Sequence, residues 1–298
     1  MRFFKVGAVV VFAVVLTTLG ISASDVLQGK SGSLLGQLAA TDPGVCPSDM
    51  VELPAALSFT CVDRFEVSSG SMCPIRTPAS AQDTQTNLND TSCIPTAQKD
   101  TLPWSNVTRE QAVALCARVG KRLPTAAEWY TMALGTPDTA ACNTSGGSAR
   151  MSGSNEACVS SGGAFDAVGN VWEWVVDDVR DAKMGEFTIP SEGYVTQVDS
   201  GGIPTMTNPV TGDVLFGDDY FWSEPSGVFG VLRGGYYGNK TDAGLFAIQA
   251  KTLPTKKTED NNNPFWTRNY KYRTKFIFSW NTRHRILNCR IKVPQNII

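Results

Sequence analysis

Gly-Asn-Val-Trp-Glu-Trp-Val-Val, residues 169–176, is the stretch that decides the fold of this chain. Its pattern is that of a β-strand with Trp172, Trp174 and Val176 on one face. Tryptophan side chains bury large areas and are mostly found inside proteins. We therefore expect this face to pack in the core rather than to form a platform for a ligand.

Two short helices are predicted before this strand. Thr108 and Gln111 have the spacing of a capping box, and apolar residues follow at helical intervals up to Gly120. Thr125 and Glu128 repeat the capping box ahead of a shorter apolar face. Glu128 is therefore interpreted as a helix cap.

Signals of regular structure are weak after the strand. Residues 177–230 contain only short strand patterns, at 193–198 and 214–216, among Gly, Pro and Asp residues. We interpret them as a long irregular insertion, a kind of segment that is often functional. Leu-Arg-Gly-Gly at 232–235 then begins another strand, and its Arg233 is expected to be a structural ion-pair partner.

The length and the net charge of the chain limit its domain organisation and its partners. The 298 residues suffice for one large domain or two small ones. A net charge of −2 gives no general electrostatic reason to expect binding to nucleic acid or to acidic membranes. Basic and aromatic residues do mix at 256–285, a composition that binds single-stranded nucleic acid or glycans in some proteins. We interpret that segment as a solvated insertion and expect no nucleic-acid partner.

The N-terminus has the organisation of an export signal. In residues 1–24 a basic start is followed by an uncharged, mostly apolar run at 6–21 and by small residues where a peptidase can cut. The alternative is a retained N-terminal anchor, which would be the only contact with a membrane. Both predict a secreted or cell-surface, extracytoplasmic protein, with a linker at 25–45 and one folded domain at 46–298.

The eight cysteines agree with that location, because an even count in an exported chain indicates disulfides. If cysteines that are neighbours in the sequence bond to each other, Cys116 and Cys289 remain as one long-range pair. The predicted pairs are Cys46–Cys61, Cys73–Cys93, Cys142–Cys158 and Cys116–Cys289. Many other pairings are compatible with eight cysteines, so proximity alone does not fix them. A zinc site is not expected, since Cys-x-x-Cys is absent and His284 is the only histidine.

Four segments in order carry a family resemblance. They are Cys-Val-Asp-Arg-Phe-Glu-Val (61–67), Gly-Lys-Arg-Leu-Pro-Thr-Ala-Ala-Glu-Trp (120–129), Gly-Asn-Val-Trp-Glu-Trp (169–174) and Leu-Arg-Gly-Gly (232–235). This set resembles the formylglycine-generating-enzyme, or sulfatase-modifying factor, domain. The resemblance implies an α+β, C-type-lectin-like fold that is loop-rich and disulfide-bonded. It also implies a bond between Cys116 and Cys289, although the tail reads Ile-Leu-Asn-Cys-Arg where the family has Gly-Phe-Arg-Cys.

We do not expect this chain to catalyse the reactions of the family that it resembles. The oxidase uses two nearby cysteine thiolates that bind copper, and the stretch 236–250 contains no cysteine. The related sulfoxide synthases need a histidine-ligated iron, and a Ser-His-Asp triad would have to use His284. We therefore predict a non-enzyme, with a cysteine-dependent oxidase acting on sulfatases as the alternative.

A second group with this fold lacks those cysteines: the variable proteins of diversity-generating retroelements. Their variable region typically begins Arg-Gly-Gly, continues with aromatic and Asn-rich positions, and ends with Ala-Gly-x-Phe-Ala and a proline. The segment 232–290 resembles such a region, with Ala-Gly-Leu-Phe-Ala at 243–247 and Pro254. The ligand-binding residues that this implies are Tyr236, Tyr237, Gly238, Asn239, Asp242, Gln249, Lys251 and Thr252.

The composition of these positions supports binding independently. Tyrosine gives a large contact area with few rotamers, and Asn and Gly adapt their hydrogen bonds. The alternative is that Tyr236 and Tyr237 pack in the core. We predict a protein or glycan ligand at a cell surface; a fixed structural or adhesion module remains the other possibility. No cofactor is required, but the resemblance implies a possible structural Ca²⁺ at Asn170 and Glu173, unless these residues are a hydrogen-bonded core pair.

Overall fold

The computed structural model describes residues 46–53, 60–254 and 286–291. The predicted export signal and linker, at 1–45, and the segment 256–285 lie outside the described residues. No helix among those described is long and apolar enough to cross a membrane.

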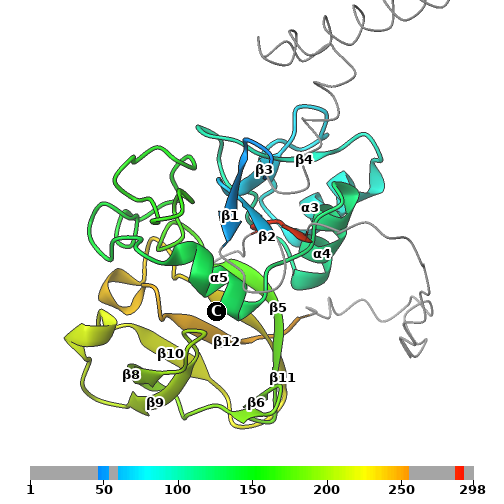
Figure 1. The fold of residues 1–298 in the computed structure, drawn as a ribbon. Coiled ribbons are helices and arrows are strands. Elements are labelled where there is room, and N and C mark those ends of the chain that lie inside the picture. The colour runs from blue at the N-terminus through cyan, green and yellow to red at the C-terminus, as the bar shows by residue number, and fades with distance from the viewer. Residues whose placement is uncertain (1–45, 54–59, 255–285, 292–298) are drawn as a thin grey trace, which may run out of the picture. The chain divides into compact units, whose positions relative to one another are not determined.

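A mixed sheet of eight strands forms the centre of the domain (Figure 1). Its strands are antiparallel except for β10 and β12, which pair in parallel. In spatial order they are β7 (Phe187–Thr188), β6 (Lys183–Met184), β5 (Glu173–Arg180), β11 (Val228–Arg233), β12 (Ile248–Thr252), β10 (Tyr220–Ser223), β8 (Gly193–Val198) and β9 (Pro204–Asn208). The predicted strand around Trp174 is thus β5, paired with β11 through Trp174 opposite Leu232.

Helix α5 (Ala126–Ala133) packs against one face of this sheet. Its Trp129 and Met132 belong to a buried apolar cluster with Val175 of β5 and Val231 of β11. The same cluster includes residues of β1 (Met50–Leu53) and β2 (Thr60–Asp63), so α5 lies between the small sheet and the large one (Figure 1). Thr125 and Glu128 form the predicted capping box, which confirms Glu128 as a cap.

The opposite face is covered only in part. Helix α4 (Arg109–Arg118), with its predicted Thr108–Gln111 capping box, supplies Leu115 to a second apolar cluster that contains Trp172, Trp174 and Leu232. Helix α3 (Ala81–Asn89) and the two-stranded antiparallel sheet of β3 (Val67–Ser69) and β4 (Pro95–Ala97) also lie on this side. Both tryptophans are therefore in the core as predicted, whereas Val176 is exposed.

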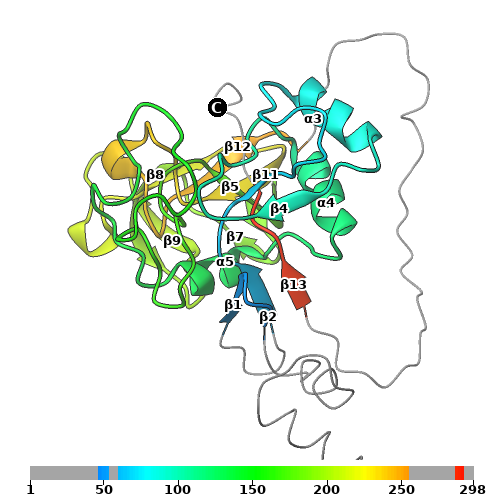
Figure 2. The same ribbon diagram turned by 90° about the horizontal axis from the view of Figure 1, so that it is seen from above.

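The C-terminal stretch returns to the N-terminal part of the domain. Strand β13 (Ile286–Asn288) pairs in parallel with β2, and the two lie side by side in Figure 2. Cys289 follows directly and bonds Cys116 of α4, with the Cα atoms 5.7 Å apart. The other bonds are Cys46–Cys61, Cys73–Cys93 and Cys142–Cys158, so the structure has the same four pairs as the sequence suggested.

The insertion at 177–230 is more regular than expected. It contributes strands β6 to β10 to the large sheet, each only two to six residues long. Strands this short show little periodicity, and their pairing partners rather than their own pattern hold them in place. The expected strand at 214–216 is instead a 3₁₀ turn, η1 (Val214–Phe216), capped by the Asp213 side chain.

Candidate functional site

The predicted binding segment forms a compact loop between β11 and β12. It contains a short 3₁₀ helix, η2 (Lys240–Asp242). Main-chain atoms attach the loop to the rest of the domain: the Tyr237 N–H donates to the Asn170 carbonyl over 3.1 Å, and the Lys240 N–H donates to the Thr144 carbonyl over 2.9 Å. The position of the loop therefore depends on its backbone at these two points.

Two glycines let the loop approach the core so closely. Gly234 and Gly235 have φ angles of 87° and 84°, in the left-handed region that favours glycine. A Cβ on Gly234 would lie 2.2 Å from the Ala167 carbonyl oxygen, and one on Gly235 would lie 2.3 Å from the Ala243 Cβ. The Gly-Gly of the sequence motif is thus a geometric requirement of this turn.

Asn239 has a structural role inside the loop. Its Oδ1 accepts a hydrogen bond from the Tyr236 N–H over 2.9 Å. Its own N–H donates to the Tyr236 carbonyl, and its carbonyl accepts from the Asp242 N–H. This predicted ligand-binding residue therefore fixes the loop conformation with its side chain.

The other loop side chains are partly or fully accessible. Tyr236 and Tyr237 are half-buried, with ring centroids 5.4 Å apart and ring planes at 72°. Tyr236 also packs against the second apolar cluster, so it belongs partly to the core. Gly238 is exposed, and the half-buried Asp242 has its pKa raised by loss of hydration.

Two of the predicted ligand-binding residues are inside the protein. Gln249 and Thr252 are each 1% exposed, and the Thr252 hydroxyl donates to Gln249 Oε1 over 2.9 Å. Gln249 lies between Leu232 and Trp222 on neighbouring strands, which cover it. Placing both at an exposed surface was therefore wrong, because spacing along a strand does not reveal which positions its neighbours cover.

Lys251 lies on the same strand and is half-buried at the surface. Its ammonium contacts Glu192 and lies 3.4 Å from Glu224 Oε1. Next to this group are the half-buried aromatic side chains of Tyr194, Tyr220 and Trp222. The sequence analysis missed these aromatic residues, although the alternation of Tyr220-Phe-Trp-Ser is a strand signal that places Tyr220 and Trp222 on one face.

Arg233 is fully buried but makes no ion pair among the described residues, contrary to expectation. Its guanidinium donates to the carbonyls of Gly202, over 3.0 Å, and of Leu245, over 3.2 Å. It also lies 4.8 Å from the centre of the Trp129 ring. Burial lowers the pKa of Arg233 to about 10.

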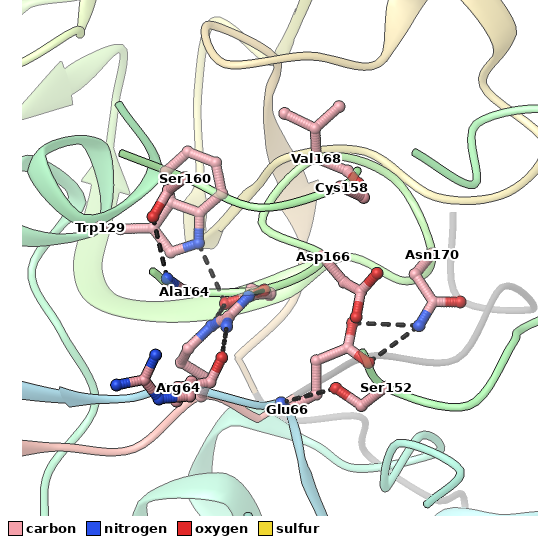
Figure 3. A network of polar contacts seen from close by, with 12 residues as sticks. Arg64, Glu66, Trp129, Ser152, Cys158, Ser160, Ala164, Asp166, Val168 and Asn170 are labelled. Atoms are coloured by element: carbon pink, nitrogen blue, oxygen red, sulfur yellow. Dashed lines mark hydrogen bonds and ion pairs between the residues drawn. The ribbon is translucent and has the colours of Figure 1, made fainter. Parts of the chain in front are cut away.

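Asn170 takes part in a buried polar network (Figure 3). Its Nδ2 donates to both carboxylate oxygens of Glu66, at 2.8 and 3.1 Å. Its Oδ1 accepts from the Arg150 N–H over 2.8 Å and from Asn143 Nδ2 over 3.1 Å. In the same view Glu66 also lies beside Ser152, whose hydroxyl accepts from the Glu66 N–H.

Glu173 is held by a cation of the protein itself. Its carboxylate accepts from Arg290 over 2.5 and 3.0 Å and from the Trp129 indole N–H over 3.1 Å. A calcium ion here would have to displace a guanidinium, and the oxygen of Asn170 is already engaged. The residues present therefore do not fit Ca²⁺ at Asn170 and Glu173, and no group of three or more His, Cys, Asp or Glu among the described residues is arranged to hold a metal.

All eight cysteines are bonded in disulfides, so the described residues offer no free thiol for copper. What the site contains is a backbone-anchored loop and an aromatic, charged strand face. Both lie on a disulfide-bonded, mostly-sheet scaffold.

The chain belongs to the sulfatase-modifying factor enzyme 1-like domain family, whose model matches residues 57–261. The resemblance read from the sequence motifs is thereby confirmed. No curated protein matches the chain.

Similar solved structures include three variants of one protein, the Major Tropism Determinant. The I1 variant is 15% identical with a TM-score of 0.33, the P3c variant 16% with 0.33, and the M1 variant 17% with 0.34. The aligned parts cover 69%, 69% and 71% of this chain, respectively. The chain spans 58% of the length of the I1 and P3c variants and 50% of the M1 variant.

Proposed function

We propose that this protein is an exported ligand-binding protein whose loop at 236–242 displays side chains that, apart from Asn239, can be exchanged without loss of the fold. The main-chain attachment of Tyr237 and Lys240 carries this proposal, because backbone hydrogen bonds do not depend on the identity of a side chain. Rigid scaffolds that present adaptable loops are a general solution for recognition. The ligand is a protein or glycan at a cell surface.

The four disulfides support a location outside the cytoplasm, where such bonds form and persist. They also support a binding role rather than the thiol chemistry of the family's oxidases, since that chemistry needs free thiolates.

A variant with Tyr237→Asn, Lys240→Asn and Asp242→Asn tests the loop directly. Lys240 has a φ of 56°, a left-handed conformation that asparagine tolerates well. We expect the melting temperature of the variant to stay within about 3–6 °C of the wild type, because three surface changes of up to about 0.5 kcal/mol each sum to about 1.5 kcal/mol and about 1 kcal/mol shifts a domain of this size by about 2–4 °C. Capture of a ligand found on an array of cell-surface proteins and glycans should be lost.

Retention of that ligand by the triple variant would contradict the loop as binding site. Failure of the wild type to bind anything on the array would favour a fixed structural module instead. Sequencing of the coding locus across a natural population supplies a second test. Substitutions should concentrate at exposed loop positions and spare the glycines that the turn requires, Gly234, Gly235 and Gly244.

A further inference from the structure

Three aromatic side chains form a row on the open part of the large sheet. Tyr194 of β8 lies directly opposite Tyr220 of β10, with ring centroids 5.0 Å apart and planes at 85°. The Tyr220 and Trp222 rings are 4.9 Å apart and tilted by 50°. All three side chains are half-buried. Neighbouring rings stand at large angles to one another, so the row presents ring edges as well as ring faces.

This row lies on the same sheet face as Lys251. Side chains alternate along β10, and Phe221, between the two exposed rings, is buried in the cluster under α5. Trp222 pairs in register with Gln249, so the alternation along β12 places Lys251 on the Trp222 side as well. The row also adjoins the core on this face, since the Trp222 ring lies 5.5 Å from that of Trp172.

The charged groups beside the row have more negative than positive charge. Lys251 contacts Glu192 and lies 3.4 Å from Glu224, so one ammonium faces two carboxylates. Tyr220 also lies 3.4 Å from Glu192 through its hydroxyl. The Glu224 side chain is the most accessible of the charged groups, at 46% exposed against 34% for Glu192 and 30% for Lys251. A carboxylate is thus available next to aromatic ring faces.

We propose that these six residues form a second part of the binding surface, built on a constant aromatic row, that receives a cationic side chain, Arg or Lys, of a protein partner. The inference rests on the proposed binding function and specifies the chemistry of the ligand. Ring faces attract cations within about 6 Å, and a nearby carboxylate adds a charge-assisted hydrogen bond. Tyr, Trp and Arg are also the residues that dominate protein–protein contacts. The six residues, called here the aromatic–acidic patch, are Tyr194, Tyr220, Trp222, Glu192, Glu224 and Lys251.

Lys251 sets the strength of this interaction, because it competes with the partner's cation for the same carboxylates. It lies in the segment that resembles a variable region, whereas the other five members lie outside it. A change at this one position therefore alters the charge of the patch while the aromatic row stays constant. Lys251 is in this sense a residue that determines specificity.

Calorimetric titration with N-acetyl-arginine amide tests the patch, with the isosteric but uncharged N-acetyl-citrulline amide for comparison. We expect saturable millimolar binding of the arginine compound to the wild type and none of the citrulline compound. Lys251→Met, which keeps the apolar stem, should tighten binding about tenfold by releasing two carboxylates. Glu224→Gln should weaken it several-fold, and Trp222→Leu should abolish it.

Glu156→Gln is the matched control for Glu224→Gln, because Glu156 is also an exposed glutamate paired with a lysine, Lys99, over 3.2 Å. It should leave the affinity unchanged, and melting curves should show that every variant is folded. Equal binding of both compounds, weaker binding by Lys251→Met, or no binding to either wild type or Lys251→Met would overturn the inference. So would a glycan that binds through Trp222 with no effect of Glu224→Gln.

The probe reports on the patch alone, so the two proposals fail separately. If the arginine compound does not bind, the loop at 236–242 is still tested by its own triple variant. If the compound binds but the triple variant keeps its ligand, only the loop proposal is contradicted.

Discussion

Asp138 has an unusually high proton affinity for an aspartate. Loss of hydration and the neighbouring Asp218 carboxylate raise the pKa of Asp138 from 3.8 to about 6. Between these values the folded protein holds more protons than the unfolded chain, so stability should fall as the pH rises through this window. Asp138→Asn should make melting temperatures between pH 4 and 7 less dependent on pH. An unchanged slope would show that the carboxyl titrates normally.

The buried ion pair of Glu173 and Arg290 is expected to stabilise the fold. Both side chains are at most 1% exposed. Glu173→Gln removes the carboxylate that accepts from both Nε and Nη2 of the buried Arg290, and should cost about 3–5 kcal/mol in the free energy of unfolding, measured with urea. Glu156→Gln is the control, because the Glu156 side chain is exposed and its pair with Lys99 should contribute about 1 kcal/mol or less. Equal losses in the two variants would contradict this account.

Gly244 illustrates how a turn between elements constrains a residue. A Cβ at this position would lie 1.9 Å from Asp219 Oδ1, and that carboxylate is fixed because its Oδ2 accepts from the Phe246 N–H over 2.6 Å. Gly244→Ala should therefore destabilise the protein by about 1–3 kcal/mol in urea unfolding, as overpacking does. Gly162→Ala is the control, because its Cβ would meet nothing closer than 3.9 Å. Equal stabilities would refute the steric explanation.

Local signals predicted the two capped helices and the strand around Trp174, whereas elements that depend on long-range contacts were missed. Both capping boxes were found correctly because they depend on residues three positions apart. The partner of Glu173 is 117 residues away, at Arg290, in a tail that departs from the family pattern, so the sequence left both Ca²⁺ binding and a hydrogen-bonded core pair open for this residue. The burial of Gln249 likewise depends on which strands flank β12, and that order is a property of the whole sheet.

At the scale of the molecule, Cys116–Cys289 joins parts of the chain that are 173 residues apart. Chain-entropy estimates give a disulfide closing so long a loop about 5 kcal/mol, against about 3 kcal/mol for Cys142–Cys158, whose separation is 16. Replacing the first pair by serines should therefore lower the urea midpoint more than replacing the second. Equal losses would mean that the C-terminal stretch is held mainly by its hydrogen bonds to β2.

The backbone attachment of the loop at 236–242 also has a consequence for a population of molecules. If the proposed function holds, a substitution at an exposed position such as Lys240 should cost little folding free energy, unlike one at Asn239. Cells would then contain many versions of the loop at similar abundance and without extra misfolded protein. Selection would act on what each version binds, while Gly234, Gly235 and the bonded cysteines keep the fold the same.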